Sequence, residues 1–192
     1  MPLMTTRLTH DFYARDSIEV ARGLLGQRLV HRLENGEILS GRIVETEAYL
    51  GVDDPAAHSF NGRRTARTEV MFGEAGFSYI YFIYGMYFCF NVVTGAKEIP
   101  EAVLVRALDL ENANGPGKLC RALHLGREDN ALDLTRSEKL WIENDGAPSD
   151  VEIVAGPRVG IGDRHDAVHW PLRFGINNHP GLSKPKFDLT VE

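Results

Sequence analysis

The stretch QRLVHRLENGEILSGRIVETEAYL, residues 27–50, has two segments rich in branched apolar residues on either side of Asn35-Gly36. Asn-Gly is the dipeptide most typical of tight β-hairpin turns, because both residues tolerate the positive φ angles that such turns require. The flanking segments are therefore predicted to be antiparallel strands. They indicate a fold built around an antiparallel sheet.

The second of these strands brings two carboxylates together. Alternation predicts two faces, with Ile43, Glu45, Glu47 and Tyr49 on one and Val44, Thr46 and Ala48 on the other. Glu45 and Glu47 then lie about 7 Å apart along the strand. With Arg106 and His58 they supply the components of a hydrolytic site, namely a carboxylate that activates water and a second group that changes its pKa. On an exposed face the same pair would be ordinary surface residues, and both interpretations stay open here.

A second hairpin is predicted in the aromatic stretch SYIYFIYGMYFCFNVV, residues 78–93. A two-residue loop at Gly85-Met86 fits a type II′ turn, which needs glycine in its first position. This register places Tyr81 opposite Phe90 and leaves Asn91 on the other face from Tyr81.

The tip of this hairpin has two large side chains, Tyr84 and Met86. Exposed residues of this kind cost solubility and add nothing to a core, so they favour a wedge or an interface. Proteins that insert side chains between base pairs deliver apolar or aromatic wedges from such projections.

The other predicted elements are a helix at SIEVARGLL (17–25), capped by Asp16 or Ser17 and ended by Gly26, and a turn-rich loop from residue 51 to 76. A strand at 101–110, a loop entering a helix at 115–125 and short strands within 139–144, 151–162 and 170–177 follow. The predicted fold class is α+β, a single mixed domain over residues 1–192 with an antiparallel β-rich core, flanking helices and a protruding hairpin.

Composition limits the function classes. A chain of 192 residues with 43% hydrophobic residues suits one folded domain. A net charge of −6 argues against a non-specific polyanion binder. Charged residues throughout the first 22 positions are unlike a secretory signal, and the apolar run at 77–93 contains four tyrosines, so neither secretion nor a membrane span is expected.

No cofactor and no metal are predicted. Cys89 and Cys120 lack ligand or redox spacing and are expected to be buried thiols. His165 and His169 are four residues apart but lack the neighbouring ligands of a zinc site.

Seven short stretches together closely resemble the alkyladenine (3-methylpurine) DNA glycosylases: GRIVETEAYLG (41–51), AAHS (56–59), GRRTART (62–68), YIYFIYGMYFCFN (79–91), GPGKLC (115–120), PRVGIG (157–162) and PLRF (171–174). The resemblance extends from about Phe12 to Ser183. It implies a base-excision repair enzyme that flips alkylated or deaminated purines out of duplex DNA and hydrolyses the N-glycosidic bond, leaving an abasic site.

The resemblance also implies the catalytic residues. Glu47 would be the general base that activates water, and Arg106 with the backbone carbonyl of Val159 would help to hold that water. No lysine matches the catalytic position, so a monofunctional enzyme without a Schiff-base step is expected.

For the base pocket, the resemblance implies that the flipped base lies between Tyr49 on one side and His58 and Tyr81 on the other. Asn91 would exclude guanine by crowding its exocyclic amine. The register derived above conflicts with this, since the family pattern puts Tyr81 and Asn91 in one pocket.

For DNA binding, the resemblance implies that Tyr84 intercalates where the damaged nucleotide leaves the duplex, with Met86 wedged beside it. Arg63 and Arg67 would contact phosphate, and positive residues, Arg64 included, are expected to gather on this face. The expected partner is duplex DNA containing damaged purines, met by a monomer in the bacterial cytoplasm at the nucleoid, or in the nucleus of a eukaryote.

Two alternatives stay open. A nucleoside or sugar glycosidase could use Glu45 and Glu47 as an acid and base pair, and a non-catalytic sensor could bind distorted DNA through Tyr84. The tail HPGLSKPK, residues 179–186, departs from the usual ending of the family, so the resemblance assigns it no role. The ranking of 3-methyladenine, 7-methylguanine, hypoxanthine and 1,N6-ethenoadenine also stays open.

Overall fold

The computed structural model describes residues 6–145, 151–163 and 166–188. The strands in these ranges are β1 Thr6–Arg7, β2 Arg28–Arg32, β3 Ile38–Tyr49, β4 Ser78–Ile83, β5 Tyr87–Thr94, β6 Glu101–Asp109, β7 Leu140–Asn144, β8 Ile153–Gly156 and β9 Arg173–Ile176. The α-helices are α1 His10–Tyr13, α2 Ser17–Leu24 and α3 Pro116–Ala122, and short 3₁₀ helices lie at Gly51–Asp53, Phe60–Gly62, Glu69–Phe72, Arg127–Asp129 and Ala167–His169.

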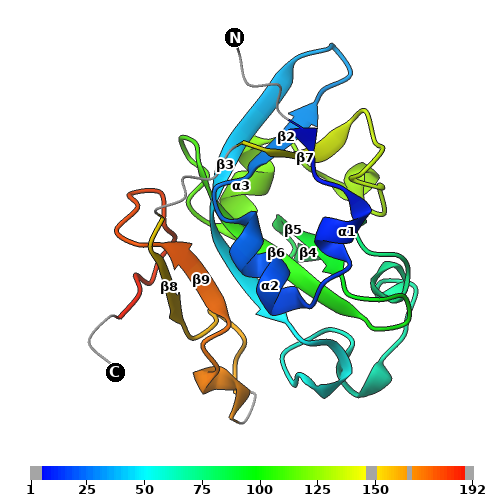
Figure 1. The fold of residues 1–192 in the computed structure, drawn as a ribbon, viewed down its shortest axis with the longest axis vertical. Coiled ribbons are helices and arrows are strands. Elements are labelled where there is room, and N and C mark those ends of the chain that lie inside the picture. Colours follow the sequence, from blue (N-terminus) through cyan, green and yellow to red (C-terminus); the bar gives the residue numbers. More distant parts are fainter. Residues whose placement is uncertain (1–5, 146–150, 164–165, 189–192) are drawn as a thin grey trace.

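All nine strands belong to one curled antiparallel sheet (Figure 1), with the order β1-β7-β2-β3-β6-β5-β4. The central strand β3 pairs with β2 along its first half and with β6 along its second half. Beyond the residues of β3 that pair with β2, strand β9 pairs with residues 45–47 of β3, and β8 pairs with β9. The α+β class predicted from the sequence is confirmed.

The first hairpin forms at the predicted dipeptide. Gly36 has φ +86°, and the Asn35 side-chain oxygen accepts a hydrogen bond from the backbone N–H of Glu37 (2.9 Å). The strands on either side pair from Arg32 with Ile38 to Arg28 with Arg42. The Asn-Gly signal therefore identified the hairpin that contains the two glutamates.

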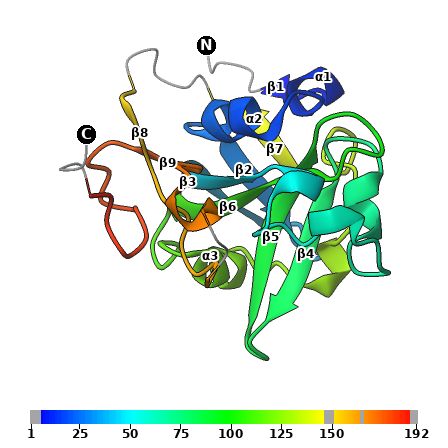
Figure 2. The same ribbon diagram turned by 90° about the horizontal axis from the view of Figure 1, so that it is seen from below.

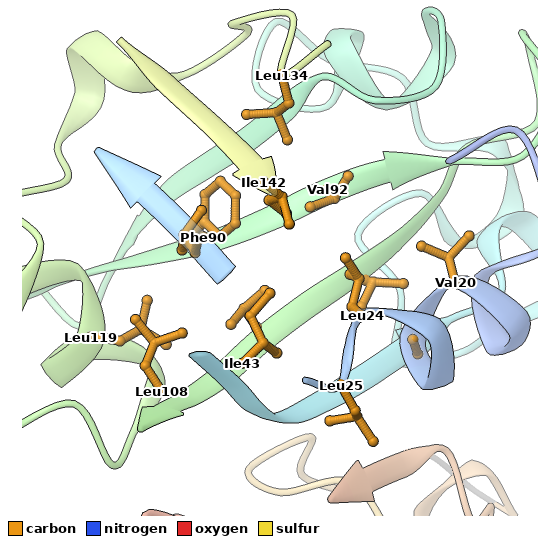
Figure 3. Packing of buried hydrophobic residues seen from close by; sticks show 14 of the residues in the cluster. Val20, Leu24, Leu25, Ile43, Phe90, Val92, Leu108, Leu119, Leu134 and Ile142 are labelled. Atoms are coloured by element: carbon orange, nitrogen blue, oxygen red, sulfur yellow. The ribbon is translucent and has the colours of Figure 1, made fainter. Parts of the chain in front are cut away.

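Helix α2 covers this sheet. Asp16 is its N-cap and accepts hydrogen bonds from the backbone N–H groups of Ile18 and Glu19. The buried side of α2 packs against β3 and β6 in the main core, where Leu24 lies between Val20 and Ile43 (Figure 3). None of the helices in the described ranges has the length and apolar character needed to span a lipid bilayer.

A β-bulge separates the two ends of β3. The register with β6 shifts on both sides of Glu45, so the alternation of faces restarts there. As a result Ile43 packs in the main core together with Ala48, and not beside Glu45 and Glu47. The prediction that Ile43 shares the face of the glutamates was wrong, because simple alternation does not anticipate a bulge.

The second hairpin, β4–β5, has a different register from the predicted one. Ile83 pairs with Tyr87, so the loop contains three residues, and both Tyr84 (φ +53°) and Gly85 (φ +65°) have positive φ angles. The prediction of a two-residue type II′ turn at Gly85-Met86 was therefore wrong, because such a turn requires Tyr84 to belong to the strand.

This register puts Tyr81 and Asn91 on one face of the β4–β5 hairpin. Tyr81 lies opposite Cys89, and Asn91 lies opposite Tyr79, so Asn91 and Tyr81 point to the same side of the hairpin. The tip of the β4–β5 hairpin projects beyond the other elements (Figure 2).

Candidate active site

A cavity of about 740 Å³ opens between the β4–β5 hairpin, the loop that follows β3, the start of α3 and residues 159–161. Nine of the eleven predicted site residues line it, which are Tyr49, His58, Arg63, Arg67, Tyr81, Tyr84, Asn91, Arg106 and Val159. Of the other two, Glu47 contacts three lining residues and Met86 is 65% exposed at the hairpin tip.

Glu47 lies fully buried at the inner end of this cavity. Its Oε1 accepts a hydrogen bond from the backbone N–H of Val159 (2.8 Å) and contacts Arg106 Nη1 (3.1 Å). Its Oε2 accepts a hydrogen bond from the hydroxyl of Tyr49 (2.8 Å). A buried carboxylate with three donors is held in one orientation, which suits a group that must receive a proton from a positioned water.

Tyr49 lies on the wall beside Glu47. Burial, and then the charge of Glu47, raise the pKa of the Tyr49 hydroxyl well above the ordinary value. The phenol therefore stays protonated and donates a hydrogen bond to Glu47. Arg158 stands over the Tyr49 ring, with 4.7 Å from the guanidinium carbon to the ring centroid. Arg158 is itself fixed by Asp54, whose Oδ1 lies 2.8 Å from Nη2.

Glu45 is equally buried and, like Glu47, is not itself a lining residue of the cavity. Its carboxylate accepts hydrogen bonds from Arg106, Arg173 and Ser183. Burial alone would raise the pKa of Glu45, but the positive charges of Arg173 and Arg106 outweigh it and hold the pKa below the ordinary value. Of the two interpretations left open by the sequence, the exposed strand face does not hold, because both glutamates are buried and Ser183 of the C-terminal segment contacts Glu45.

The opposite wall is aromatic. The rings of His58 and Tyr81 meet edge to face at 4.6 Å between centroids, and a hydrogen bond of 2.8 Å joins His58 Nδ1 to the hydroxyl of Tyr79. Burial raises the pKa of Tyr81 well above the ordinary value, and Arg67 stands over its ring. Asn91 is held beside them, since its Nδ2 donates to the Tyr79 carbonyl (3.0 Å).

The rim of the cavity carries the exposed residues. Tyr84 is 76% exposed, and Arg63 and Arg67 line the mouth without an ion pair in the described parts of the chain. Arg64 is different, since Glu69 and Glu98 both contact it at 2.7 Å and offset its charge. The positive cluster predicted for this loop is therefore smaller than expected.

Sequence reasoning missed several residues of the site. Arg158 and Tyr79 lie inside two of the motifs and Asp54 lies between two others, but none of them was assigned a role, and their contacts join segments up to 104 residues apart. Arg173 is the arginine of PLRF, and its ion pair with Glu45 was not anticipated. A signal was present for Arg173, because an arginine between apolar strand residues is seldom buried without a carboxylate partner.

Metal ligation finds no support in the described residues, which contain no group of three or more potential ligands. His165, one of the two histidines at i, i+4 spacing, lies outside the described residues. Cys89 and Cys120 are both buried free thiols, as predicted.

Comparison with known proteins agrees with these motifs. The family model described as methylpurine-DNA glycosylase (MPG) matches residues 11–180. Proteins named "Putative 3-methyladenine DNA glycosylase" from Bacillus cytotoxicus, Bacillus cereus (strain AH187) and Bacillus anthracis (strain CDC 684) are 46%, 47% and 48% identical to this chain. Each alignment covers 90% of this chain and 97% of the relative. The chain belongs to the methylpurine-DNA glycosylase family.

Proposed function

We propose that this protein is a monofunctional DNA glycosylase that removes alkylated or deaminated purines from duplex DNA by hydrolysing the N-glycosidic bond. The family match and the names of the relatives support a glycosylase that acts on methylated purines. The observation that carries the mechanism is Glu47, a buried carboxylate with fixed orientation at the inner end of an aromatic cavity.

Glu47 acts as the general base. Each carboxylate oxygen has two lone pairs, so Oε2, which accepts one hydrogen bond from Tyr49, can accept a second from a water molecule. The water oxygen bonds to C1′ while the bond from C1′ to the purine nitrogen breaks and its electron pair leaves with the base. Glu47 takes the proton of the water, and its negative charge stabilises the oxocarbenium character of the sugar.

Arg106 and Val159 position this reaction. Arg106 Nη1 lies 3.1 Å from Glu47 Oε1, and the backbone N–H of Val159 donates to the same oxygen. Both therefore fix the carboxylate, and the carbonyl of Val159 is proposed to hold the water. Lys118 also lines the cavity, but its ammonium group donates to Asn114 (3.0 Å), which favours hydrolysis by water over attack by an amine.

The damaged base occupies the aromatic part of the cavity. Tyr49 on one wall and His58 with Tyr81 on the other provide stacking surfaces, which bind a cationic alkylated purine most strongly. Asn91, held on the same face as Tyr81, excludes guanine by contact with its exocyclic amine. Flipping costs a few kcal/mol and least for a damaged or mispaired base, which adds selectivity.

The rim binds the duplex. Tyr84 fills the space left by the flipped nucleotide, Met86 wedges beside it, and Arg63 and Arg67 contact phosphate. This arrangement requires one copy of the chain, and we propose that it acts as a monomer.

Base release tests the proposal. Short duplexes with a single hypoxanthine, ethenoadenine or methylated purine are incubated with wild type and Glu47→Gln, and abasic sites are detected as alkali-sensitive breaks. Wild type is expected to act on at least one lesion and Glu47→Gln to lose about 10²- to 10⁴-fold in rate, the usual contribution of a general base, while it still binds the lesion.

Two controls separate the alternatives. Borohydride should trap no covalent complex, whereas trapping would contradict a monofunctional enzyme. Free nucleosides should not be cleaved, and lesion binding without base release by wild type would instead identify a sensor.

A further inference from the structure

Glu45 has the burial and the partners of a functional residue, yet Arg106 is the one lining residue of the cavity among its hydrogen-bond partners in the described ranges. Its Oε1 accepts hydrogen bonds from Arg106 Nε, Arg173 Nε and the hydroxyl of Ser183, each at 2.8 Å. Its Oε2 accepts one from the backbone N–H of Ser183 at 2.6 Å. Three of these four donors belong to Arg173 and Ser183, which do not line the cavity, so an effect of Glu45 on the reaction passes through the fourth, a neighbour that does line it.

Arg106 is that neighbour. Its Nε donates to Glu45, its Nη2 donates to the hydroxyl of Ser183 (3.1 Å), and its Nη1 lies 3.1 Å from Glu47 Oε1. The guanidinium group is planar and rigid, so two contacts on one edge determine where the third nitrogen points. Glu45 and Ser183 therefore set the direction in which Arg106 meets Glu47.

The C-terminal segment fixes this arrangement from outside. Arg173 Nη2 donates to the Pro185 carbonyl (2.8 Å), and the ring of Phe187 lies 4.1 Å from its guanidinium carbon. Phe187 also lies against Gly175 of β9, where a Cβ atom would approach it to 2.7 Å. The tail thus packs closely on β9 and brings Ser183 to Glu45, 138 residues earlier in the chain.

The buried charges around Arg106 balance one another, and this balance depends on Glu45. Glu45, Glu47, Arg106 and Arg173 are two carboxylates and two guanidinium groups, all at most 6% exposed. Without Glu45, Arg106 and Arg173 would face Glu47 with an excess of positive charge, and Arg106 would lose its anchor. Glu45 therefore keeps Arg106 available to Glu47 in one geometry.

We propose that Glu45 is a positioning residue for base excision, and that Ser183 of the C-terminal segment completes this function by holding both Glu45 and Arg106. This inference rests on the proposed role of Glu47 as the general base. It gives the tail a role in the chemical step, which takes place at the other end of Arg106.

Ser183 provides the sharpest test, because its substitution removes two hydrogen bonds and leaves every charge in place. Ser183→Ala loses the hydroxyl, Ser183→Thr keeps it, and Ser137→Ala is a matched control whose hydroxyl accepts hydrogen bonds from the backbone N–H groups of Lys139 and Leu140, away from the cavity. Glu45→Gln is a supporting variant, since losing a buried charge also lowers stability.

Three quantities are measured for each variant. They are the single-turnover rate constant of base release, the affinity for a duplex whose lesion nucleotide has a hydrolysis-resistant 2′-fluoro sugar, and the melting temperature. Ser183→Ala is expected to release base about tenfold more slowly, as for loss of hydrogen bonds to charged groups, with affinity and melting temperature like those of Ser137→Ala. Ser183→Thr is expected to recover most of the rate.

Other results overturn the inference. Equal rates for Ser183→Ala and Ser137→Ala would show that the tail does not reach the chemical step. A parallel loss of rate and affinity, or no rescue by threonine, would show a general structural effect. Failure of the proposed function would look different, because wild type itself would then release no base. If only the inference about Ser183 fails, wild type is active and Ser183→Ala releases base at the same rate as Ser137→Ala.

Discussion

The floor and the rim of the cavity are built in opposite ways. The floor is the charged layer behind the cavity wall, defined as Glu45, Glu47, Asp54, Arg106 and Arg158, of which Arg106 lines the cavity itself. It is buried, and each of its charged groups has a partner of opposite charge. The rim, defined as Arg63, Arg67, Tyr84 and Met86, is exposed. In the proposed mechanism, the floor residues stabilise the fold and also serve the chemical step, whereas the rim residues bind DNA and contribute little to stability.

The largest effect is expected on the floor, for Asp54→Asn. This change leaves Arg158, whose side chain is fully buried, without its carboxylate, and breaking a buried pair costs about 3–5 kcal/mol. Base release should fall as well, because Arg158 stands over Tyr49 and precedes Val159 in the chain. Chemical denaturation and single-turnover kinetics measure the two losses.

A matched control for Asp54→Asn is Asp129→Asn, which removes an equally buried carboxylate that contacts His31 and Lys139 and does not line the cavity. It should cost about 3 kcal/mol of stability and leave the rate per folded molecule unchanged. A loss of rate for Asp129→Asn would mean that the floor extends further than its contacts suggest.

Stability should depend on pH through buried groups. Positive partners lower the pKa of Glu45 and Asp129 against the opposing effect of burial, from ordinary values of 4.5 and 3.8. Their stabilisation is complete above these values and is lost as the pH falls through the lower folded values. His31 behaves oppositely: burial lowers its pKa, but Asp129 outweighs burial and raises it above 6.5, so its stabilisation is lost as the pH rises through the folded value.

The contribution of Glu45, Asp129 and His31 to the melting temperature should therefore be largest between about pH 4.5 and 6.5, the interval bounded by the ordinary values of Glu45 and His31. Calorimetry across this range tests the shape of the curve. Asp129→Asn should remove the decline on the alkaline side, because His31 loses the partner that raises its pKa. Changes at the rim should leave the curve as it is.

At the rim, Tyr84→Gly should separate function from stability. Tyr84 has φ +53°, which a non-glycine residue adopts at a cost of about 1 kcal/mol, so glycine should stabilise the hairpin slightly. Base release from a duplex should nevertheless fall, while release from a single strand, which has no stack to fill, should not. Phe82→Ala on the same hairpin is the control, since Phe82 is 44% exposed but does not line the cavity.

The smallest effect is expected for the arginines of the rim loop. Arg63→Gln should weaken DNA binding and reduce the slope of log affinity against log salt by about 0.9, the value for one phosphate contact. Arg64→Gln should change the slope less, because Glu69 and Glu98 already offset its charge. Equal slopes for the two variants would mean that Arg63 contacts no phosphate.

Local signals predicted much of the fold. Asn35-Gly36 located the first hairpin, and Asp16 before an amphipathic segment located α2. The register of β4–β5 was not predictable in this way, because it depends on a left-handed conformation at Tyr84 that tyrosine rarely adopts. The bulge at Glu45 was also missed, because no glycine or proline marks it.

The site was predicted unevenly for a similar reason. The resemblance pointed to Glu47 and to residues that line the cavity, and all of them except Arg106 lie within a continuous motif. The role of Glu45 was not predicted, because its partners Arg173 and Ser183 lie far away in the sequence. Ser183 also belongs to a C-terminal segment that matches no motif. Long-range pairing of buried charges leaves little trace in local sequence.

The three-residue loop of the β4–β5 hairpin has a consequence for engineering. Deleting one residue at the tip would leave two loop residues, and the pairing of Ile83 with Tyr87 would survive only if they form a tight turn. A one-residue slip that restores a three-residue loop would instead move Asn91 away from the side of Tyr81. Libraries intended to change the wedge should therefore vary side chains at constant loop length. A graft of this hairpin onto another scaffold would transfer the pocket wall only if Tyr84, Gly85 and Met86 were transferred together.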